Sequence, residues 1–97
     1  MKREYVIVCN RHAGVDGSLL FWGHKTEASG KRSFGGYTSN FNNCEKYTIE
    51  ELQNSGYNFP VYGEQLNRSN WKKADDFIIK ISSLKDLGYR PMLIYYR

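Results

Sequence analysis

Residues 4–23, EYVIVCNRHAGVDGSLLFWG, contain two apolar runs joined by a polar connection. The first run, Glu4–Cys9, is dense in β-branched residues and predicts a strand that is buried on both faces. The connection, residues 10–17, contains two glycines and an aspartate and predicts a turn, after which residues 18–23 predict a second strand. Because this connection is too short for a helical crossover, we expect the two strands to pair antiparallel.

A helix start is marked at Thr48. Thr48 is a good N-cap, and Glu51 stands at the third helical position, as in a capping box. Glu50 and Glu51 also suit the positive end of the helix dipole. Gly56 predicts that the helix ends after Ser55, which gives a helix of about two turns.

Three further segments are predicted to be extended. A short strand is expected near Gly36–Ser39. Tyr57–Tyr62 also has an extended pattern, but Pro60 limits it to an edge or irregular strand, because proline lacks the N–H group that a central strand donates. Pro91–Tyr96 predicts the final strand, with its proline at the start, where the missing N–H group is tolerated.

Residues 76–81, DFIIKI, allow two interpretations. The dense β-branched run favours a strand. The rival interpretation is a helix over Trp71–Leu87, because Phe77, Ile81 and Leu84 also fit helical spacing. We favour the strand, because Ser82 and Ser83 then offer a new N-cap. A short second helix is expected at Leu84–Leu87, and Gly88 ends it.

These elements predict one α+β domain over residues 1–97, a mostly antiparallel sheet of about 4–5 strands with one or two short helices. No apolar run approaches the about 18 residues that a transmembrane helix needs. The N-terminus also lacks the longer apolar region of a signal peptide. We therefore expect a cytoplasmic protein without a membrane partner.

The balance of charges favours anionic partners. The 97 residues include 14 Lys and Arg against 10 Asp and Glu, a formal net charge of +4. A positive charge of this size promotes association with anionic molecules without identifying one.

The candidate binding region follows the second strand. Residues 19–37, LLFWGHKTEASGKRSFGGY, continue from apolar strand into a basic loop with four glycines. Lysine and arginine attract an anion, glycines permit close backbone approach, and Tyr37 or Phe34 can stack or pack. The loop does not contain the Walker motif of phosphate-binding loops. We assign Trp22, at the end of the apolar strand, to the core. The candidate ligand-binding residues are Lys25, Lys31, Arg32, Gly35, Gly36 and Tyr37.

Metal binding is a weaker interpretation. Cys9, His12, His24 and Cys44 are possible ligands, but their spacing matches no familiar zinc motif. Cysteine is commonly a small buried apolar residue, so we interpret Cys9 as part of the first strand. We predict no metal and no cofactor.

Two histidines raise the question of catalysis. His12 precedes Asp16 by four residues, and His24 precedes Glu27 by three, so that either carboxylate could orient an imidazole for proton transfer. No nucleophile elbow or oxyanion loop accompanies these pairs. We therefore assign no catalytic residue and favour a protein that is not an enzyme.

Three segments carry a family resemblance: LLFWGH (19–24), GGYTSN (35–40) and CEKYTIEEL (44–52). In this N-terminal half the chain resembles small, poorly characterised proteins encoded by bacteriophages and prophages. The resemblance implies a phage accessory protein that acts on host machinery or host defence, in the cytoplasm of the bacterial host. It brings no catalytic residues.

The favoured hypothesis is a non-enzymatic accessory binding protein that antagonises a host factor or defence system. It would act by stoichiometric binding of a host protein or an anionic, nucleotide-type ligand. One alternative is a nucleic-acid-binding regulator, since aromatic and basic residues alternate in the chain. Another is a small phosphodiesterase- or nuclease-like enzyme that uses His12 or His24. A homodimer through an edge strand or the tyrosine-rich surface is also possible.

Overall fold

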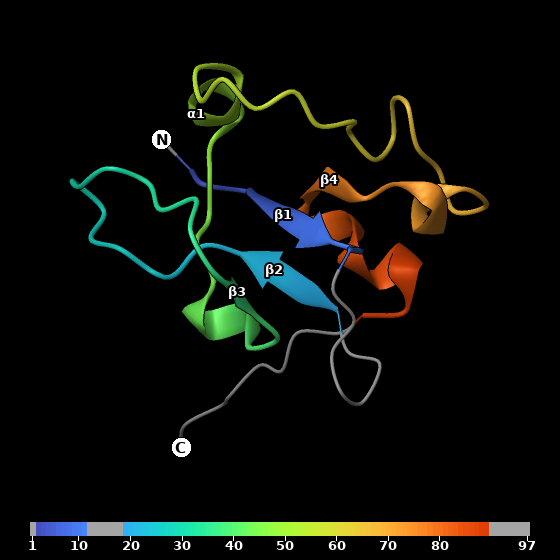
Figure 1. Ribbon diagram of the computed structural model, residues 1–97, viewed down its shortest axis with the longest axis horizontal. Helices are drawn as coiled ribbons and strands as arrows, with labels where there is room; N and C mark the ends of the chain where they lie inside the picture. Colours follow the sequence, from blue (N-terminus) through green and yellow to red (C-terminus); the bar gives the residue numbers. More distant parts are fainter. Residues whose placement is uncertain (1, 12–18, 90–97) are drawn as a thin grey trace.

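The computed structural model describes residues 2–11 and 19–89 (Figure 1). Within these residues there are four strands, one α-helix and three 3-10 helices. The elements are β1 (Tyr5–Cys9), β2 (Leu20–Trp22), β3 (Tyr37–Thr38), η1 (Phe41–Asn43), α1 (Ile49–Gln53), η2 (Trp71–Lys73), β4 (Asp76–Lys80) and η3 (Ile81–Leu87). The predicted final strand, Pro91–Tyr96, lies outside the described residues.

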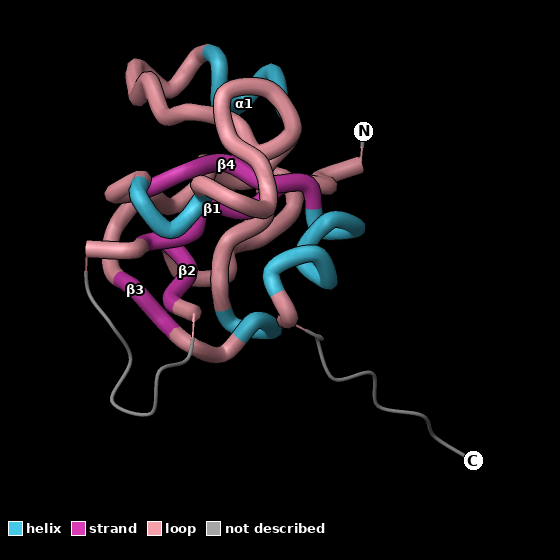
Figure 2. The backbone as a smooth tube through the Cα atoms, turned by 90° about the vertical axis from the view of Figure 1, so that its right-hand side faces the viewer, coloured by secondary structure: helices cyan, strands magenta, loops and turns pink. Residues whose placement is uncertain are grey.

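The strands form one antiparallel sheet in the order β3-β2-β1-β4. Val8 of β1 faces Phe21 of β2 on one side and Phe77 of β4 on the other. In Figure 2 the strands lie one above another in this order. The predicted α+β class and the antiparallel pairing of the first two strands are confirmed.

The central strand β1 is buried on both faces, as its composition predicts. Val6 and Val8 belong to one apolar cluster, together with Phe21 and Phe77 from the neighbouring strands. Ile7 and the other alternate residue, Cys9, belong to a second cluster. Because successive side chains of a strand point to opposite faces, the two clusters cover the two sides of the sheet.

Helix α1 begins as predicted and ends early. The Thr48 hydroxyl accepts a hydrogen bond from the Glu51 N–H, and the Glu51 carboxylate accepts one from the Thr48 N–H, which confirms the capping box. The helix ends at Gln53 rather than after Ser55. The Ser55 N–H and hydroxyl both donate to the Leu52 carbonyl, which tightens the last turn.

Residues 76–80 form a strand, which confirms that interpretation over the helical one. The expected N-cap at Ser82 or Ser83 is wrong, because η3 begins directly at Ile81, without a side-chain cap. The Ile81 N–H donates instead to the Glu4 carbonyl at 2.7 Å, so the chain turns into the helix straight from the sheet. Gly88 follows the helix with φ +85°, as expected of a glycine stop.

The segment from Pro60 to Tyr62 lies along the outer edge of β4. The Ile78 N–H donates to the Pro60 carbonyl at 2.9 Å, and the Tyr62 N–H donates to the Ile78 carbonyl at 2.8 Å. This is a single parallel bridge, and it confirms the edge position that Pro60 predicts. The opposite edge is β3, which confirms the short strand expected near Gly36–Ser39.

Candidate functional site

The loop between β2 and β3 extends to one side of the sheet (Figure 1) and is held there by one carboxylate. Glu45, only 2% exposed, accepts a hydrogen bond from Arg32 Nη1 at 2.9 Å and one from the Ser33 N–H at 2.9 Å. The Thr26 hydroxyl donates to the same carboxylate. Glu45 therefore connects Thr26, near the start of the loop, with Arg32 and Ser33, nearer its end.

The pKa of Glu45 reflects two opposing effects. Burial alone would raise it, because a low-dielectric surrounding disfavours the charged form. The hydrogen bonds from Thr26 and Ser33, together with the charge of Arg32, outweigh burial and lower the pKa below its ordinary value. The carboxylate is therefore ionised at neutral pH and able to balance Arg32.

Arg32 lies inside the loop instead of pointing into solvent. Its side chain is 6% exposed, and Nη2 donates to the carbonyls of Glu27 and Gly30 while Nη1 is taken by Glu45. Both terminal nitrogens are thus already hydrogen-bonded within the protein. Arg32 contributes charge and closes the loop, and its Nη groups are not available to a ligand without rearrangement.

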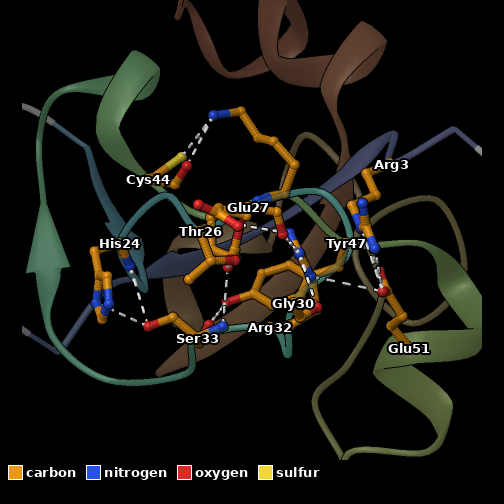
Figure 3. Close-up of polar contacts among 12 residues, drawn as sticks. Arg3, His24, Thr26, Glu27, Gly30, Arg32, Ser33, Cys44, Tyr47 and Glu51 are labelled. Atoms are coloured by element: carbon orange, nitrogen blue, oxygen red, sulfur yellow. Dashed lines mark hydrogen bonds and ion pairs between the residues drawn. The ribbon is translucent and has the colours of Figure 1, made fainter.

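A second carboxylate extends this network toward the N-terminus. Glu51 lies 3.7 Å from Arg32 Nε and pairs with Arg3, whose Nε and Nη2 approach its oxygens to 3.0 and 2.9 Å. The hydrogen bond from Arg3 is the main reason why the pKa of Glu51 is lowered. Positive and negative side chains therefore alternate along the row Arg3, Glu51, Arg32 and Glu45. Figure 3 shows Arg3 and Glu51 at one side of this group and His24 and Ser33 at the other.

Gly23 and Tyr47 fix the backbone of Ser33. The Tyr47 hydroxyl donates to the Ser33 carbonyl at 2.5 Å, and burial raises the pKa of that hydroxyl. Gly23 has φ +78°, and a Cβ there would stand 2.6 Å from the Ser33 oxygen and 2.8 Å from Glu45 Cβ. Only glycine fits this close approach. The loop backbone is thus anchored at Ser33, by the Tyr47 hydroxyl and by close packing against Gly23.

A cleft of about 500 Å³ lies beside this network. Its walls carry four cationic side chains against one carboxylate, and that carboxylate is already paired with Arg32. The lining residues are Arg3, Lys25, Thr26, Ala28, Arg32, Phe41, Asn42, Cys44, Glu45 and Lys46.

Two of the four cations are not balanced by a carboxylate within the part of the chain that the structure describes. Lys46 Nζ donates to the carbonyls of Phe41 and Cys44 at 2.6 and 3.0 Å and lies 4.3 Å from the centre of the Phe41 ring. Lys25 is exposed, and its side chain makes no hydrogen bond or ion pair with a described residue. The cleft therefore carries a net positive charge.

The six predicted ligand-binding residues do not form one site. Lys25 and Arg32 line the cleft. Lys31 is exposed and does not line it.

The remaining three lie at the edge of the sheet. Gly35 and Gly36 are exposed and precede Tyr37 in β3, where Tyr37 is 43% exposed. The ring of Tyr37 meets the buried Trp22 edge-on at 5.7 Å, which confirms Trp22 as core. The loop is divided because Glu45 holds its first part while pairing with β2 holds its last residues.

Eight of the ten lining residues are not among the predicted ligand-binding residues, and two of these eight, Arg3 and Lys46, are cationic. Arg3 precedes β1, and Lys46 lies two residues after Cys44, so each belongs to a different segment from the loop. No local pattern connects them. Their only signal in the sequence is their positive charge, which many surface residues share.

The histidines and cysteines take other places. His24 Nδ1 lies 2.9 Å from the Ser33 hydroxyl, while His12 and Asp16 fall outside the described residues. Cys9 and Cys44 belong to different apolar clusters, and burial raises the pKa of the Cys44 thiol. In residues 2–11 and 19–89, no group of three or more His, Cys, Asp or Glu side chains is placed to hold a metal ion.

Comparison with known proteins finds no relative. No family model matches the chain, and searches of curated proteins and of solved structures return no match either. None of the helices in the described ranges has the length and apolar character to cross a bilayer.

Proposed function

We propose that this protein is a non-enzymatic binding protein that holds an anionic, nucleotide-type ligand in its basic cleft. One observation carries the proposal: four cationic side chains line a cleft that contains a single, already paired carboxylate. Fixed positive charge in a concave, partly desolvated site attracts anions more strongly than the same charge on a flat surface.

The dimensions and rigidity of the cleft support this function. A volume of about 500 Å³ falls within the range of small-molecule sites. The walls are fixed before a ligand arrives, because Arg32 and Thr26 are bound to Glu45 and Lys46 is bound to backbone carbonyls. Binding therefore needs little ordering of these three side chains, which favours affinity.

The resemblance to phage-encoded proteins suggests how such binding would act. A protein that only binds must be present in amounts comparable with its target, so we propose stoichiometric antagonism of a host factor or defence system. The target would be an anionic nucleotide-type ligand or an acidic surface of a host protein. The nucleic-acid-binding regulator, the enzyme using His12 or His24, and the homodimer stay predictions, because no contact among residues 2–11 and 19–89 favours them.

Calorimetric titration with nucleoside mono-, di- and triphosphates at low salt tests the proposal. We expect binding that weakens as salt is added, because the attraction is electrostatic. Lys25→Glu should reduce affinity by at least about tenfold, since it replaces an attractive charge with a repulsive one. Lys31→Glu is the matched control, because Lys31 is exposed in the same loop and does not line the cleft.

Two results would overturn the proposal. One is the absence of binding to every nucleotide at low salt. The other is an equal loss of affinity in the Lys25 and Lys31 variants, which would show that overall charge and not the cleft attracts the anion. Native mass spectrometry of protein purified from cells would measure the mass of any co-purified ligand and the number of ligands bound per chain.

A further inference from the structure

We infer that the cleft recognises the phosphate group of its ligand and leaves the organic part in solvent. This inference rests on the proposed function and deepens it: the recognised group is the phosphate of the nucleotide, so that any ligand presenting a phosphate group would bind. Three features of the lining residues carry it: the donors that remain free, the unbalanced charge, and the state of the one aromatic ring.

Few donors of the lining side chains remain for a ligand. Arg32 has both Nη groups engaged, and its Nε is buried near Glu51. Lys46 uses its ammonium group on the carbonyls of Phe41 and Cys44. These two cations therefore act through their charge and not through direct hydrogen bonds.

The free donors belong to Lys25, Arg3 and Asn42. Arg3 binds Glu51 through Nε and Nη2, which leaves Nη1 without a described acceptor. The side chains of Lys25 and Asn42 make no hydrogen bond to any residue in the described ranges. A compact group with several acceptor oxygens can use donors that come from three segments of the chain, as a phosphate does.

The unbalanced charge of the cleft also suits a phosphate. The carboxylates of Glu45 and Glu51 offset Arg32 and Arg3. The charges of Lys25 and Lys46 are left, and a phosphate monoester carries roughly −1.5 to −2 at neutral pH. Such an ion would nearly neutralise the cleft, whereas a monoanion would leave about one positive charge.

No aromatic face in the cleft is free to stack on a base. Phe41 is the one aromatic lining residue; Lys46 Nζ lies 4.3 Å from its ring centre, and Phe21 meets the ring edge-on at 5.7 Å. The exposed rings of Tyr37 and Tyr57 contact Trp22 and do not line the cleft. A base would therefore gain little from this site.

The test compares inorganic phosphate, AMP, adenosine and succinate as calorimetric probes of the full chain at low salt. We expect phosphate and AMP to bind within about threefold of each other, and adenosine and succinate at least about tenfold more weakly. Asn42→Ala should weaken the binding of phosphate and the binding of AMP by the same factor, and so should Lys25→Gln. Lys31→Gln is the matched control and should change neither affinity, while Tyr37→Ala should also leave both unchanged.

The possible failures are distinguishable. If AMP binds more than about tenfold tighter than phosphate, or if Tyr37→Ala weakens AMP alone, the base is recognised and this inference is wrong while anion binding stands. If succinate binds as tightly as phosphate, only charge is recognised and the inference is again wrong. If no anion binds at all, both this inference and the proposed function fail.

Discussion

Two regions on either side of Ser33 are held together by different forces. On one side, the loop residues Thr26 and Arg32 are fixed by hydrogen bonds to the buried carboxylate of Glu45. On the other side, Phe34 stacks on Tyr47 and Tyr57 with ring centres 4.9 and 5.2 Å apart. The first region is a network of charges, and the second is a row of rings.

The difference determines how each region should respond to mutation. A buried ion pair is fragile, because removal of one partner leaves an uncompensated charge in a low-dielectric surrounding. A ring cluster loses only part of its contacts when one exposed ring is changed. Tyr57 is 45% exposed, so its loss also leaves a smaller cavity than the loss of a buried ring. We therefore expect the charged network to be much more sensitive than the rings.

The largest effect is expected at Glu45. Glu45→Ala leaves the guanidinium of Arg32, 6% exposed, without its carboxylate and should lower the free energy of unfolding by about 3–5 kcal/mol. Urea titration followed by tryptophan fluorescence measures this change. Glu64→Ala, at an exposed position, is the matched control and should change stability by less than about 0.5 kcal/mol. Equal unfolding midpoints for the two variants would contradict a supporting role of the network.

The next effect is expected at Gly23. Gly23→Ala places a Cβ 2.6 Å from the Ser33 oxygen at a backbone φ of +78°, so that steric overlap adds to conformational strain. We expect a loss of about 3 kcal/mol, against about 1 kcal/mol for Gly36→Ala. Gly36 is the matched control because its φ is +81° and a Cβ there would meet nothing within 4 Å. If both variants lower the free energy of unfolding by the same amount, the close approach of Gly23 to the Ser33 oxygen does not contribute to stability.

A smaller effect is expected in the ring cluster. Tyr57→Leu removes stacking on Phe34 and Phe59, and the edge contact with Trp22, and should lower the free energy of unfolding by about 1 kcal/mol. Tyr57→Phe keeps the ring and should stay within about 0.3 kcal/mol of the original protein. Thermal unfolding of both variants separates the contribution of the ring from that of the hydroxyl.

The smallest effect is a dependence of stability on pH. Glu45 and Glu51 both have a pKa below its ordinary value in the folded protein. Because the folded pKa is lower than the unfolded one, their contribution is fully present above about pH 5 and is lost as the pH falls below about 4. The urea midpoint should therefore begin to decrease as the pH falls below about 5 and should continue to decrease below about 4.

Glu51→Gln provides the control for that pH dependence. The variant cannot ionise at position 51, so it should show a shallower decrease of the urea midpoint toward low pH than the original protein. If its midpoint falls just as steeply, the carboxylate of Glu51 does not link protonation to stability.

Features that depend on neighbouring residues were predictable from the chain. The capping box joins Thr48 and Glu51 across a single helical turn, so the residue types alone indicate it. The burial of β1 follows from its unbroken apolar run, and Gly88 ends a helix because glycine adopts positive φ without strain. The exact ends of helices were less predictable. The start of η3 depends on a hydrogen bond from Ile81 to Glu4, on a distant strand.

The site depended on contacts between residues far apart in the chain. Basic residues and glycines in the loop correctly indicated positive charge, but whether a given cation is free was decided by the fold. Arg32 is held by Glu45, 13 residues away, while Lys25 in the same loop stays free of described side-chain partners. Arg3 lines the cleft and pairs with Glu51, 48 residues away. Side-chain identity thus determined the charge of this region, and tertiary pairing determined which charges remain available, because a carboxylate acts through space and not along the chain.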